Sequence, residues 1–251
     1  MSGARHAFIT GGGSGIGLAT ARALATTGVR LTLAGRNVDK VQSAAEEFEF
    51  AYAVACDVTD ESSVNAAFAA ARDRYGVIDI LINNAGQAPS APFKRTTLAF
   101  WNAVLATNLT GAFLCTQVAL PDMLDAKWGR IINVGSVCSL KGYAYVSAYV
   151  ASKHGLLGLT RALAHETAKQ GVTVNCVCPG YVDTPIVTES IDRLTSKTSL
   201  SAEEAHASLI QFNPQGRIIA PEEVASAIAY LCTDAAASIN GAAIPITGGE
   251  V

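Results

Sequence analysis

The chain has 251 residues and a formal net charge of −3; half of its residues are apolar and 16% are charged. This composition suits one large α/β domain and argues against disorder, while the slight negative charge argues against nucleic acid as a partner. The first residues lack the long apolar core of a signal peptide, so we expect a cytoplasmic protein. We also expect no membrane span, because no uninterrupted apolar run reaches the roughly 18 residues that one requires.

Short apolar runs bounded by turn residues alternate with longer amphipathic segments, which is typical of βαβ units in a parallel sheet. Strands are expected at 7–9, 30–34, 51–56, 78–82, 130–134, 172–177 and 243–246. Helices are expected at 16–27, 38–48, 61–75, 97–125, 147–169 and 221–232. Pro121 marks a kink or break in the fourth helix. The pattern predicts a single doubly wound α/β domain over residues 1–251, with a mostly parallel seven-stranded sheet and helices on both faces.

The alternation fails between residues 183 and 217, where short polar helical pieces replace it. We expect this segment to form a lid over the substrate. Its apolar residues either line a pocket or anchor the helices of the lid.

Six cysteines are scattered along the chain without Cys-x-x-Cys spacing. Cys176 and Cys178 share one face of a predicted strand but match no common zinc pattern. We expect buried reduced thiols that pack as small apolar side chains, and no metal.

A glycine-rich turn, residues 10–17, joins the first predicted strand to the first helix. Without side chains, its backbone N–H groups and the helix N-terminus can approach a pyrophosphate. The spacing Gly-x-x-x-Gly-x-Gly differs from the standard dinucleotide fingerprint, so taken alone the turn is also compatible with a plain tight turn. In its strand–turn–helix context it predicts a dinucleotide site formed by Gly11, Ser14, Gly15, Ile16 and Gly17.

The second strand ends at Gly35-Arg36-Asn37, where enzymes that prefer NAD usually carry a carboxylate. A guanidinium can pair with a 2′-phosphate through two parallel hydrogen bonds. We therefore favour NADP(H) over NAD(H), with Arg36 as the phosphate ligand. The alternative is that Arg36 is a solvated loop cation.

Two more strands end at the same predicted edge of the sheet. Asp57 and Val58 follow the third strand, where Asp57 either contacts the adenine or caps a turn. Asn84 and Gly86 follow the fourth strand. An asparagine can bridge backbone groups of neighbouring strands, and a glycine permits close approach of a cofactor, so we assign both to the cofactor site.

Tyr149 and Lys153 lie four residues apart in a predicted helix, so their side chains point from one face of it. A phenol beside a cation ionises more readily and can exchange a proton with an alcohol or ketone near neutral pH. Together with the glycine turn, the pair predicts a dehydrogenase that transfers hydride. His154 lies about 100° around the helix from Lys153 and is expected to face elsewhere.

These motifs resemble those of the short-chain dehydrogenase/reductase superfamily, and the resemblance covers essentially the whole chain. The matches occur in the family's order and comprise the glycine turn, Asn83-Asn84-Ala85-Gly86, Asn108, Ser136, Tyr149-x-x-x-Lys153 and Pro179-Gly180. The resemblance implies a Rossmann-type fold, a homotetramer and an NAD(P)-dependent oxidoreductase.

The same resemblance implies a role for each matched residue. Tyr149 would be the general acid in reduction and the general base in oxidation. Lys153 would lower the pKa of the tyrosine and bind the nicotinamide ribose. Ser136 would hold the substrate oxygen, and Asn108 would keep a water in place for proton relay. The resemblance places Pro179, Gly180, Val182 and Thr184 on the nicotinamide side of the cofactor site. Val182 and Thr184 would contact the carboxamide.

Within the superfamily the chain is most similar to 3-ketoacyl reductases and 3-hydroxyacyl dehydrogenases. This likeness implies reduction of a 3-ketoacyl thioester or a similar small carbonyl compound, and Lys94, Arg95 and Lys141 are candidates to attract coenzyme A. Reductases of carrier-bound substrates commonly dock the carrier with two arginines. Arg130 matches the position of the first arginine, whereas Gln170 stands near the position of the second. A coenzyme A thioester and a free ketone therefore both remain possible substrates. The alternatives are an NAD-dependent hydroxyacid, steroid or xenobiotic alcohol dehydrogenase and, from another class, a non-catalytic nucleotide-sensing regulator.

Overall fold

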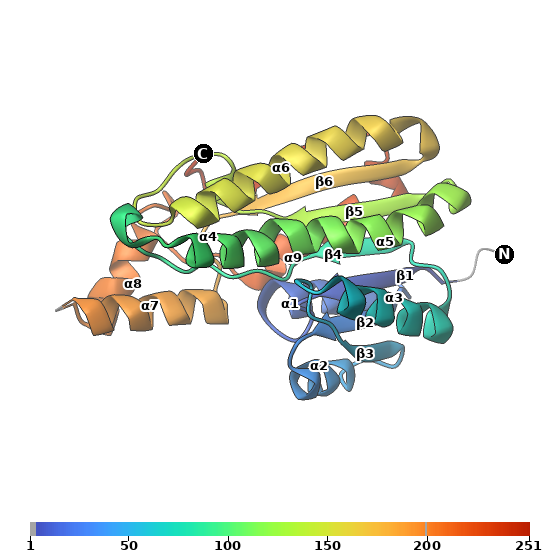
Figure 1. Ribbon diagram of the computed structural model, residues 1–251, viewed down its shortest axis with the longest axis horizontal. Helices are drawn as coiled ribbons and strands as arrows, with labels where there is room; N and C mark the ends of the chain where they lie inside the picture. The colour runs from blue at the N-terminus through green and yellow to red at the C-terminus, as the bar shows by residue number, and fades with distance from the viewer. Residues whose placement is uncertain (1–3, 199) are drawn as a thin grey trace.

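A single parallel sheet runs through the computed structural model, which describes residues 4–198 and 200–251 (Figure 1). Its strand order is β3-β2-β1-β4-β5-β6-β7, and every neighbouring pair is parallel. The strands are β1 (His6–Thr10), β2 (Arg30–Gly35), β3 (Ala51–Ala55), β4 (Ile80–Asn83), β5 (Gly129–Val134), β6 (Val172–Pro179) and β7 (Ala243–Ile246). The prediction of a doubly wound Rossmann-type sheet is confirmed.

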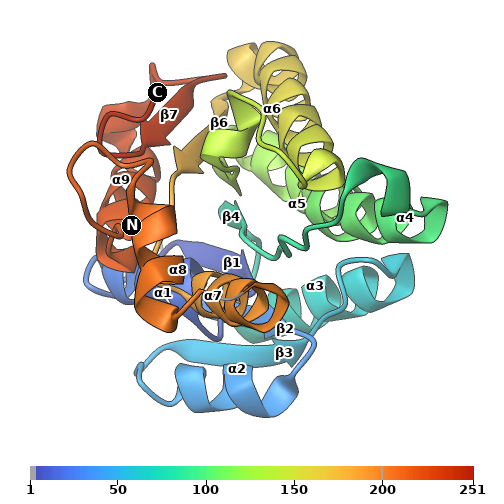
Figure 2. The same cartoon turned by 90° about the vertical axis from the view of Figure 1, so that its left-hand side faces the viewer.

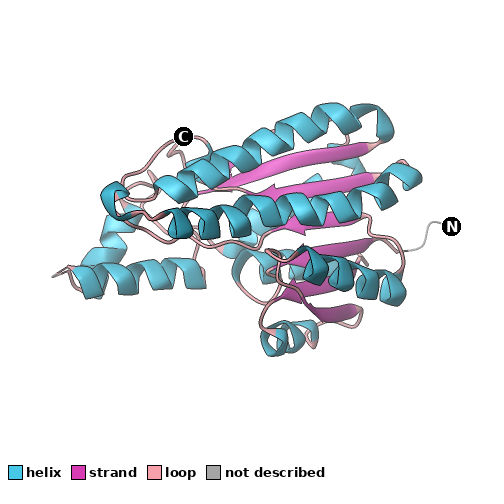
Figure 3. Cartoon of the chain, viewed as in Figure 1, coloured by secondary structure: helices cyan, strands magenta, loops and turns pink. Residues whose placement is uncertain are grey.

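Helices cover both faces of this sheet (Figures 2 and 3). One face packs against α1 (Gly15–Ala25), α2 (Val38–Ala45) and α9 (Pro221–Leu231). The other face packs against α3 (Glu61–Tyr75), α5 (Gly111–Ala126) and α6 (Ser147–Thr167). Because both faces are covered, the central strands are buried along their whole length and read as nearly continuous apolar runs.

Alternation along β1 shows how the strand serves both layers. Ile9 packs into the cluster beneath α1 and α9, whereas Phe8 points to the opposite face and stacks on Phe68 of α3 at 4.0 Å between ring centroids. Both side chains are fully buried. This packing fixes the carboxyl end of β1, from which the glycine turn departs.

The fourth predicted helix is interrupted, but not at Pro121. It consists of α4 (Leu98–Leu105), a π-helical turn η2 (Ala106–Thr110) and α5, which continues through Pro121 to Ala126. The π-helical turn inserts extra backbone into the helix, and such turns often occur at functional sites. Of the predicted kink or break at Pro121, the break does not occur, and the interruption of the helix lies around Asn108.

One helical run among the described residues, Leu98–Ala126, is long and apolar enough to cross a membrane by length and composition alone, although polar residues interrupt it. Its second half packs on the sheet beside α3, and Asp122 pairs with Arg72 of α3 at 2.8 Å. The run is thus a covering helix of the α/β sandwich.

The segment expected to form a lid contains two helices, α7 (Pro185–Lys197) and α8 (Ala202–Ile210), and Ser199 between them lies outside the described residues. Both helices extend beyond the carboxyl edge of the sheet (Figure 1). Ser201 caps α8, since its hydroxyl accepts from the backbone N–H of Glu204 while the Glu204 carboxylate accepts from the N–H of Ser201. Single 3₁₀ turns occur at η1 (Phe93–Arg95), η3 (Val137–Ser139), η4 (Ala168–Gln170) and η5 (Asp234–Ala236).

Candidate active site

The glycine turn lies where the winding of the sheet reverses. From β1 the chain continues to β2 on one side, whereas β4 lies on the other side of β1, so a crevice forms at the carboxyl ends of these strands. A Cβ on Gly17 would lie 2.4 Å from the carbonyl oxygen of Gly11, so no larger residue fits there without moving the turn. The sequence therefore needs glycine at this position to fold the turn against the helix.

Asn84 braces the turn from β4. Its side-chain amide donates to the carbonyls of Thr10 and Gly11 at 2.9 and 3.1 Å. In return, the Thr10 hydroxyl accepts from the backbone N–H groups of Asn84 and Ala85, both at 3.0 Å. The predicted bridging role of Asn84 between neighbouring strands is confirmed by these hydrogen bonds.

The start of α1 suits a phosphate group. Ser14 occupies the N-cap position of α1, but its side chain makes no capping hydrogen bond. The first N–H groups of the helix are therefore available to a ligand. Gly15 has a φ of +52°, in the left-handed region, and packs directly under Thr184, whose Cγ2 would lie 3.0 Å from a Cβ on this glycine. These residues fit the pyrophosphate of a dinucleotide, and Ile16 lines the cavity beyond it.

Arg36 and Lys40 lie near the glycine turn on the side of β2. Arg36 is exposed beyond the end of β2, and the stem of Lys40, in the first turn of α2, packs against Gly13. Lys40 was missed in the sequence because it is close to Gly13 only in space. Two cations at this position fit an adenosine 2′-phosphate.

Asp57 takes the role of a turn residue. Its Oδ1 accepts from the backbone N–H and the hydroxyl of Thr59 at 2.9 and 2.7 Å, and these bonds, with a smaller contribution from Arg36, lower the pKa of Asp57. Val58 is buried against Gly111 at the start of α5. Contacts of Asp57 and Val58 with the cofactor stay predictions.

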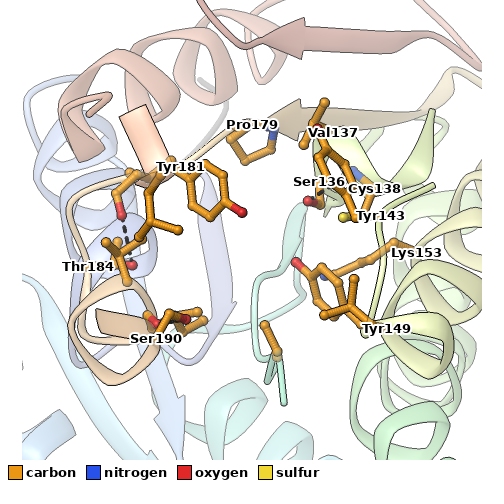
Figure 4. A pocket seen from close by; sticks show the side chains of 18 of the residues that line it. Ser136, Val137, Cys138, Tyr143, Tyr149, Lys153, Pro179, Tyr181, Thr184 and Ser190 are labelled. Atoms are coloured by element: carbon orange, nitrogen blue, oxygen red, sulfur yellow. Dashed lines mark hydrogen bonds between the residues drawn. The ribbon is translucent and has the colours of Figure 1, made fainter. Parts of the chain in front are cut away.

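Beyond the turn lies a cavity of about 560 Å³ that brings together the reactive side chains (Figure 4). Ser136, Tyr149 and Lys153 line it, and the hydroxyl of Tyr149 points toward that of Ser136. The size and the mainly apolar lining suit a small organic substrate. Other residues of the predicted cofactor site line the same cavity: Ile16, Asn84, Gly86, Pro179, Gly180, Val182 and Thr184.

Ser136 is held by the short 3₁₀ helix η3 that follows β5. Its hydroxyl accepts from the backbone N–H of Cys138 at 3.1 Å, and its own N–H donates to the Ser139 hydroxyl at 3.2 Å. This reciprocal capping fixes the serine rotamer in the cavity. The Cys138 thiol lies beside it, and burial raises the pKa of that thiol to about 11, so the thiol is neutral at pH 7.

Lys153 is buried, with 5% of its surface exposed, and its ammonium donates to the Val134 carbonyl at 2.7 Å. Burial lowers the pKa of Lys153 to about 8. Its Nζ lies 5.7 Å from the centre of the Tyr149 ring. Burial raises the pKa of Tyr149, while hydrogen bonding with Ser136 opposes that rise. The expected lowering of the tyrosine pKa by Lys153 stays a prediction.

Asn108 lies behind Gly86 in the π-helical turn and is buried. Its side chain accepts from the N–H of Gln87 and donates to the Gln87 carbonyl, both at 2.9 Å, and donates to the Ser152 hydroxyl at 3.1 Å. A Cβ on Gly86 would lie 3.4 Å from Oδ1 of Asn108 and 3.7 Å from Nζ of Lys153. Asn108 thus ties the loop after β4 to α6, and its part in a proton relay stays a prediction.

The loop after β6 forms the wall opposite Tyr149. The N–H of Gly180 donates to the Ile246 carbonyl at 3.0 Å, and Val182 forms a parallel bridge with Ile219. The Thr184 hydroxyl donates to the Val182 carbonyl at 3.1 Å. These bonds position the loop between the glycine turn and α6, which carries Tyr149 and Lys153.

Comparison with known proteins agrees with this geometry. Residues 5–195 match the model of the short chain dehydrogenase family. The chain belongs to the short-chain dehydrogenase family. It is 36% identical to a 3-oxoacyl-[acyl-carrier-protein] reductase of Aquifex aeolicus, over 96% of this chain and 95% of that protein. It is 37% identical to a D-β-hydroxybutyrate dehydrogenase of Cupriavidus necator, over 100% of this chain and 99% of that protein.

Among solved structures, the chain is similar to a variant of the actinorhodin polyketide ketoreductase with NADPH. The TM-score is 0.95 at 36% identity, and the match covers 100% of this chain and 99% of the other. Relatives of this short-chain dehydrogenase are thus oxidoreductases that act on ketones or on secondary alcohols, and the prediction of an enzyme of this class is confirmed.

Three aromatic residues, Tyr143, Tyr181 and Phe212, line the cavity from three different segments. Phe212 is one of the apolar lid residues expected to line a pocket or anchor the lid, whereas no motif indicated Tyr181. Glu250, which follows β7, accepts a hydrogen bond from the Tyr143 hydroxyl. The pairing of Tyr143 with Glu250 left no signal in the sequence, because the two residues are 107 positions apart in the chain.

Cations considered for acyl carriers take other positions in this member of the family. Arg130 has 2% of its surface exposed, pairs with Asp234 at 3.5 Å, and donates to the carbonyl of Gly171 at the amino edge of the sheet. Burial and these partners leave little of Arg130 exposed to a carrier, and its match to a docking arginine stays a prediction. Lys141 pairs with Glu250 at 3.1 Å. His154 turns away from the cavity, with its Nδ1 3.0 Å from the Val150 carbonyl.

All six cysteines are buried free thiols. Among the described residues, no group of three or more His, Cys, Asp or Glu side chains is placed to hold a metal ion.

Proposed function

We propose that this protein transfers hydride between NADP(H) and a ketone or secondary alcohol, with a 3-ketoacyl thioester or a similar small carbonyl compound as the substrate. The observation that carries the proposal is the convergence of Ser136, Tyr149 and Lys153 in one cavity that adjoins the glycine turn. Relatives named as reductases of 3-oxoacyl and polyketide ketones support reduction of the ketone as the direction of the reaction.

The reactive side chains divide the work of ketone reduction. The bound cofactor supplies the hydride. Ser136, fixed by its capping bonds, donates a hydrogen bond to the carbonyl oxygen and stabilises the charge that develops there. Tyr149 delivers the proton to that oxygen, because burial keeps its phenol protonated at neutral pH.

Lys153 supports this chemistry electrostatically. With a pKa of about 8 it is mostly protonated at pH 7, and its ammonium lies close enough to the ring to stabilise a phenolate after proton transfer. Its bond to Val134 holds the side chain across the floor of the cavity, where it can also reach the ribose. Asn108 keeps the loop that carries Gly86 in place beside it.

Arg36 and Lys40 support NADP(H) as the cofactor. The acid that would bind ribose hydroxyls is missing at the end of β2; instead Arg36 is exposed just beyond that strand and Lys40 packs against Gly13 of the glycine turn. NADPH in the related ketoreductase structure agrees with this choice.

A second function is favoured by two relatives. The matches to D-β-hydroxybutyrate dehydrogenases support an NAD-dependent hydroxyacid dehydrogenase. Side-by-side titration of NADPH and NADH separates the two: clear NADPH preference supports the reductase, and NADH preference supports the dehydrogenase. A nucleotide-sensing regulator would not need the three reactive side chains in one cavity. The homotetramer and the cytoplasmic location stay predictions.

The test is Tyr149→Phe, with acetoacetyl-CoA as the ketone. We expect kcat to fall by about 10³-fold, within the range of general acid catalysis, while the Kd for NADPH changes less than about twofold. Tyr230→Phe, an exposed tyrosine on α9, is the matched control and should have wild-type activity. Normal turnover by Tyr149→Phe would rule out its role as proton donor.

A further inference from the structure

A buried carboxylate lies under the wall of the cavity and has no part in the chemistry above. The side chain of Glu250 has 4% of its surface exposed. It accepts a hydrogen bond from the Tyr143 hydroxyl and pairs with the Lys141 ammonium at 3.1 Å. A carboxylate is costly to bury unless its oxygens are paired, so these two partners are what allow Glu250 to occupy this place.

The Tyr143 ring connects this ion pair to the substrate cavity. It meets the ring of Phe212 edge-on, with 5.9 Å between centroids, and Phe212 stacks on Tyr181 at 6.3 Å. All three rings line the cavity, and they come from the loop after η3, the end of α8 and the loop after β6. Figure 4 shows Tyr181 on the side facing Tyr149, with Tyr143 behind Ser136. We call these three side chains the aromatic wall.

Only Tyr143 in the aromatic wall is anchored by a charge. Burial and the neighbouring carboxylate raise the pKa of Tyr143, so the phenol remains a hydrogen-bond donor to Glu250. Glu250 also lies against the loop after β6, since its Oε2 would be 3.6 Å from a Cβ on Gly180. One carboxylate therefore touches two of the three segments that form the wall.

We propose that Glu250 is a positioning residue that sets substrate selection, by holding Tyr143 so that the aromatic wall packs against a ring carried by the ketone. The proposal rests on the ketone reduction proposed above and deepens it: the substrate class is ketones with a cyclic or aromatic group next to the reacting carbonyl. Such a group gains from offset or edge-on contacts with the three rings, whereas a short aliphatic ketone does not reach them.

The test compares two ketones, 1-tetralone with a fused aromatic ring and ethyl acetoacetate without one. In Tyr143→Phe and Glu250→Ala we expect KM for 1-tetralone to rise about five- to tenfold, which corresponds to the loss of one or two aromatic contacts. We expect KM for ethyl acetoacetate to rise by a smaller factor than KM for 1-tetralone, and the Kd for NADPH to change less than twofold. Glu250→Gln, which can still accept from the phenol, should lie close to wild type.

The double variant Tyr143→Phe/Glu250→Ala distinguishes positioning from two separate effects. If Glu250 acts through Tyr143, the double variant has the same KM for 1-tetralone as either single variant. Glu166→Gln, an exposed carboxylate on α6, is the control and should match wild type. Multiplicative losses in the double variant, or equal losses with both ketones, would overturn the proposal.

Binding of 1-tetralone measured by calorimetry separates this proposal from the proposed function. If the wild-type protein binds 1-tetralone and Glu250→Ala weakens that binding, the wall acts as proposed even where turnover is absent and the reductase assignment fails. If the wild-type protein reduces ethyl acetoacetate but does not bind 1-tetralone, the reductase assignment stands and the aromatic wall has been misread. Melting temperatures of all variants show whether Glu250→Ala folds, and Tyr143→Phe, which removes only the hydroxyl that Glu250 accepts from, gives the answer if it does not.

Discussion

Replacing Lys153 with methionine should make the protein more stable at neutral pH while abolishing the function proposed for this lysine. Burial lowers the pKa of Lys153 from the ordinary 10.5 to about 8. At pH 7 the folded protein must therefore keep an ammonium group where it is poorly solvated, and the unfolded chain does not. At 1.36 kcal/mol per pH unit, the difference between the two pKa values corresponds to about 3 kcal/mol of lost stability.

Methionine also removes a favourable contact. The bond from Nζ of Lys153 to the Val134 carbonyl, 2.7 Å long, contributes about 1 kcal/mol. The net gain of Lys153→Met at pH 7 is then about 2 kcal/mol in the free energy of unfolding. The buried charge costs stability below pH 8, and this cost disappears as the pH rises to 10.5, because in that window the unfolded state binds the proton more tightly. Above pH 10.5 the variant should be about 1 kcal/mol less stable than wild type.

Urea denaturation of both proteins at pH 7 and pH 10.5 measures this difference directly. Other titrating groups affect both proteins alike, so the change in the difference reports Lys153. Lys169→Met, at an exposed position just after the same helix, is the control and should show no pH-dependent difference from wild type. A stability difference between wild type and Lys153→Met that is the same at both pH values would refute the reasoning.

Two further predictions concern the cofactor site. Arg36→Ala should weaken binding of NADPH by about tenfold or more and of NADH by less than twofold, because only NADPH carries the 2′-phosphate; Lys40→Ala should shift the ratio in the same direction but less, and calorimetric titration of both cofactors checks this. An equal loss of affinity for NADPH and NADH in Arg36→Ala would show that Arg36 does not contact the 2′-phosphate. Thr10→Val keeps the shape of a buried side chain but leaves the N–H of Ala85 without its acceptor, whereas the N–H of Asn84 keeps the Ile82 carbonyl at 3.1 Å, so the free energy of unfolding should fall by about 2 kcal/mol in urea denaturation. A fall of less than about 0.5 kcal/mol would show that the N–H of Ala85 finds another partner.

The order of strands and helices could be predicted because each element carries its own signal. Buried strands read as short apolar runs, and helices such as α3 begin at a capping residue and end at a glycine, here Asp60 and Gly76. The fourth helix shows the limit of this approach. Pro121 looked like a break, yet α5 continues through it, whereas the π-helical turn at Ala106–Thr110 contains neither glycine nor proline to mark it.

The reactive residues were predictable to the extent that their geometry is local. Tyr149 and Lys153 share a helix face by their spacing, and the glycine turn follows a strand end. The partners that adjust the site are not local: Tyr143 and Glu250 are 107 positions apart, and the contact of Lys40 with Gly13 joins two different βα connections. Residue spacing contains no information about such pairs, because they exist only once the sheet has brought its carboxyl ends together.

The contact between Gly15 and Thr184 bears on the order in which the enzyme takes up its two substrates. Pro185, which begins α7, lies next to this contact, so the lid starts at the same turn that we propose for the pyrophosphate. A lid that closes over a ketone before the dinucleotide has arrived would cover the turn. We therefore expect a compulsory sequence, with the nucleotide first to bind and last to leave, so that NADP⁺ inhibits competitively against NADPH and non-competitively against the ketone.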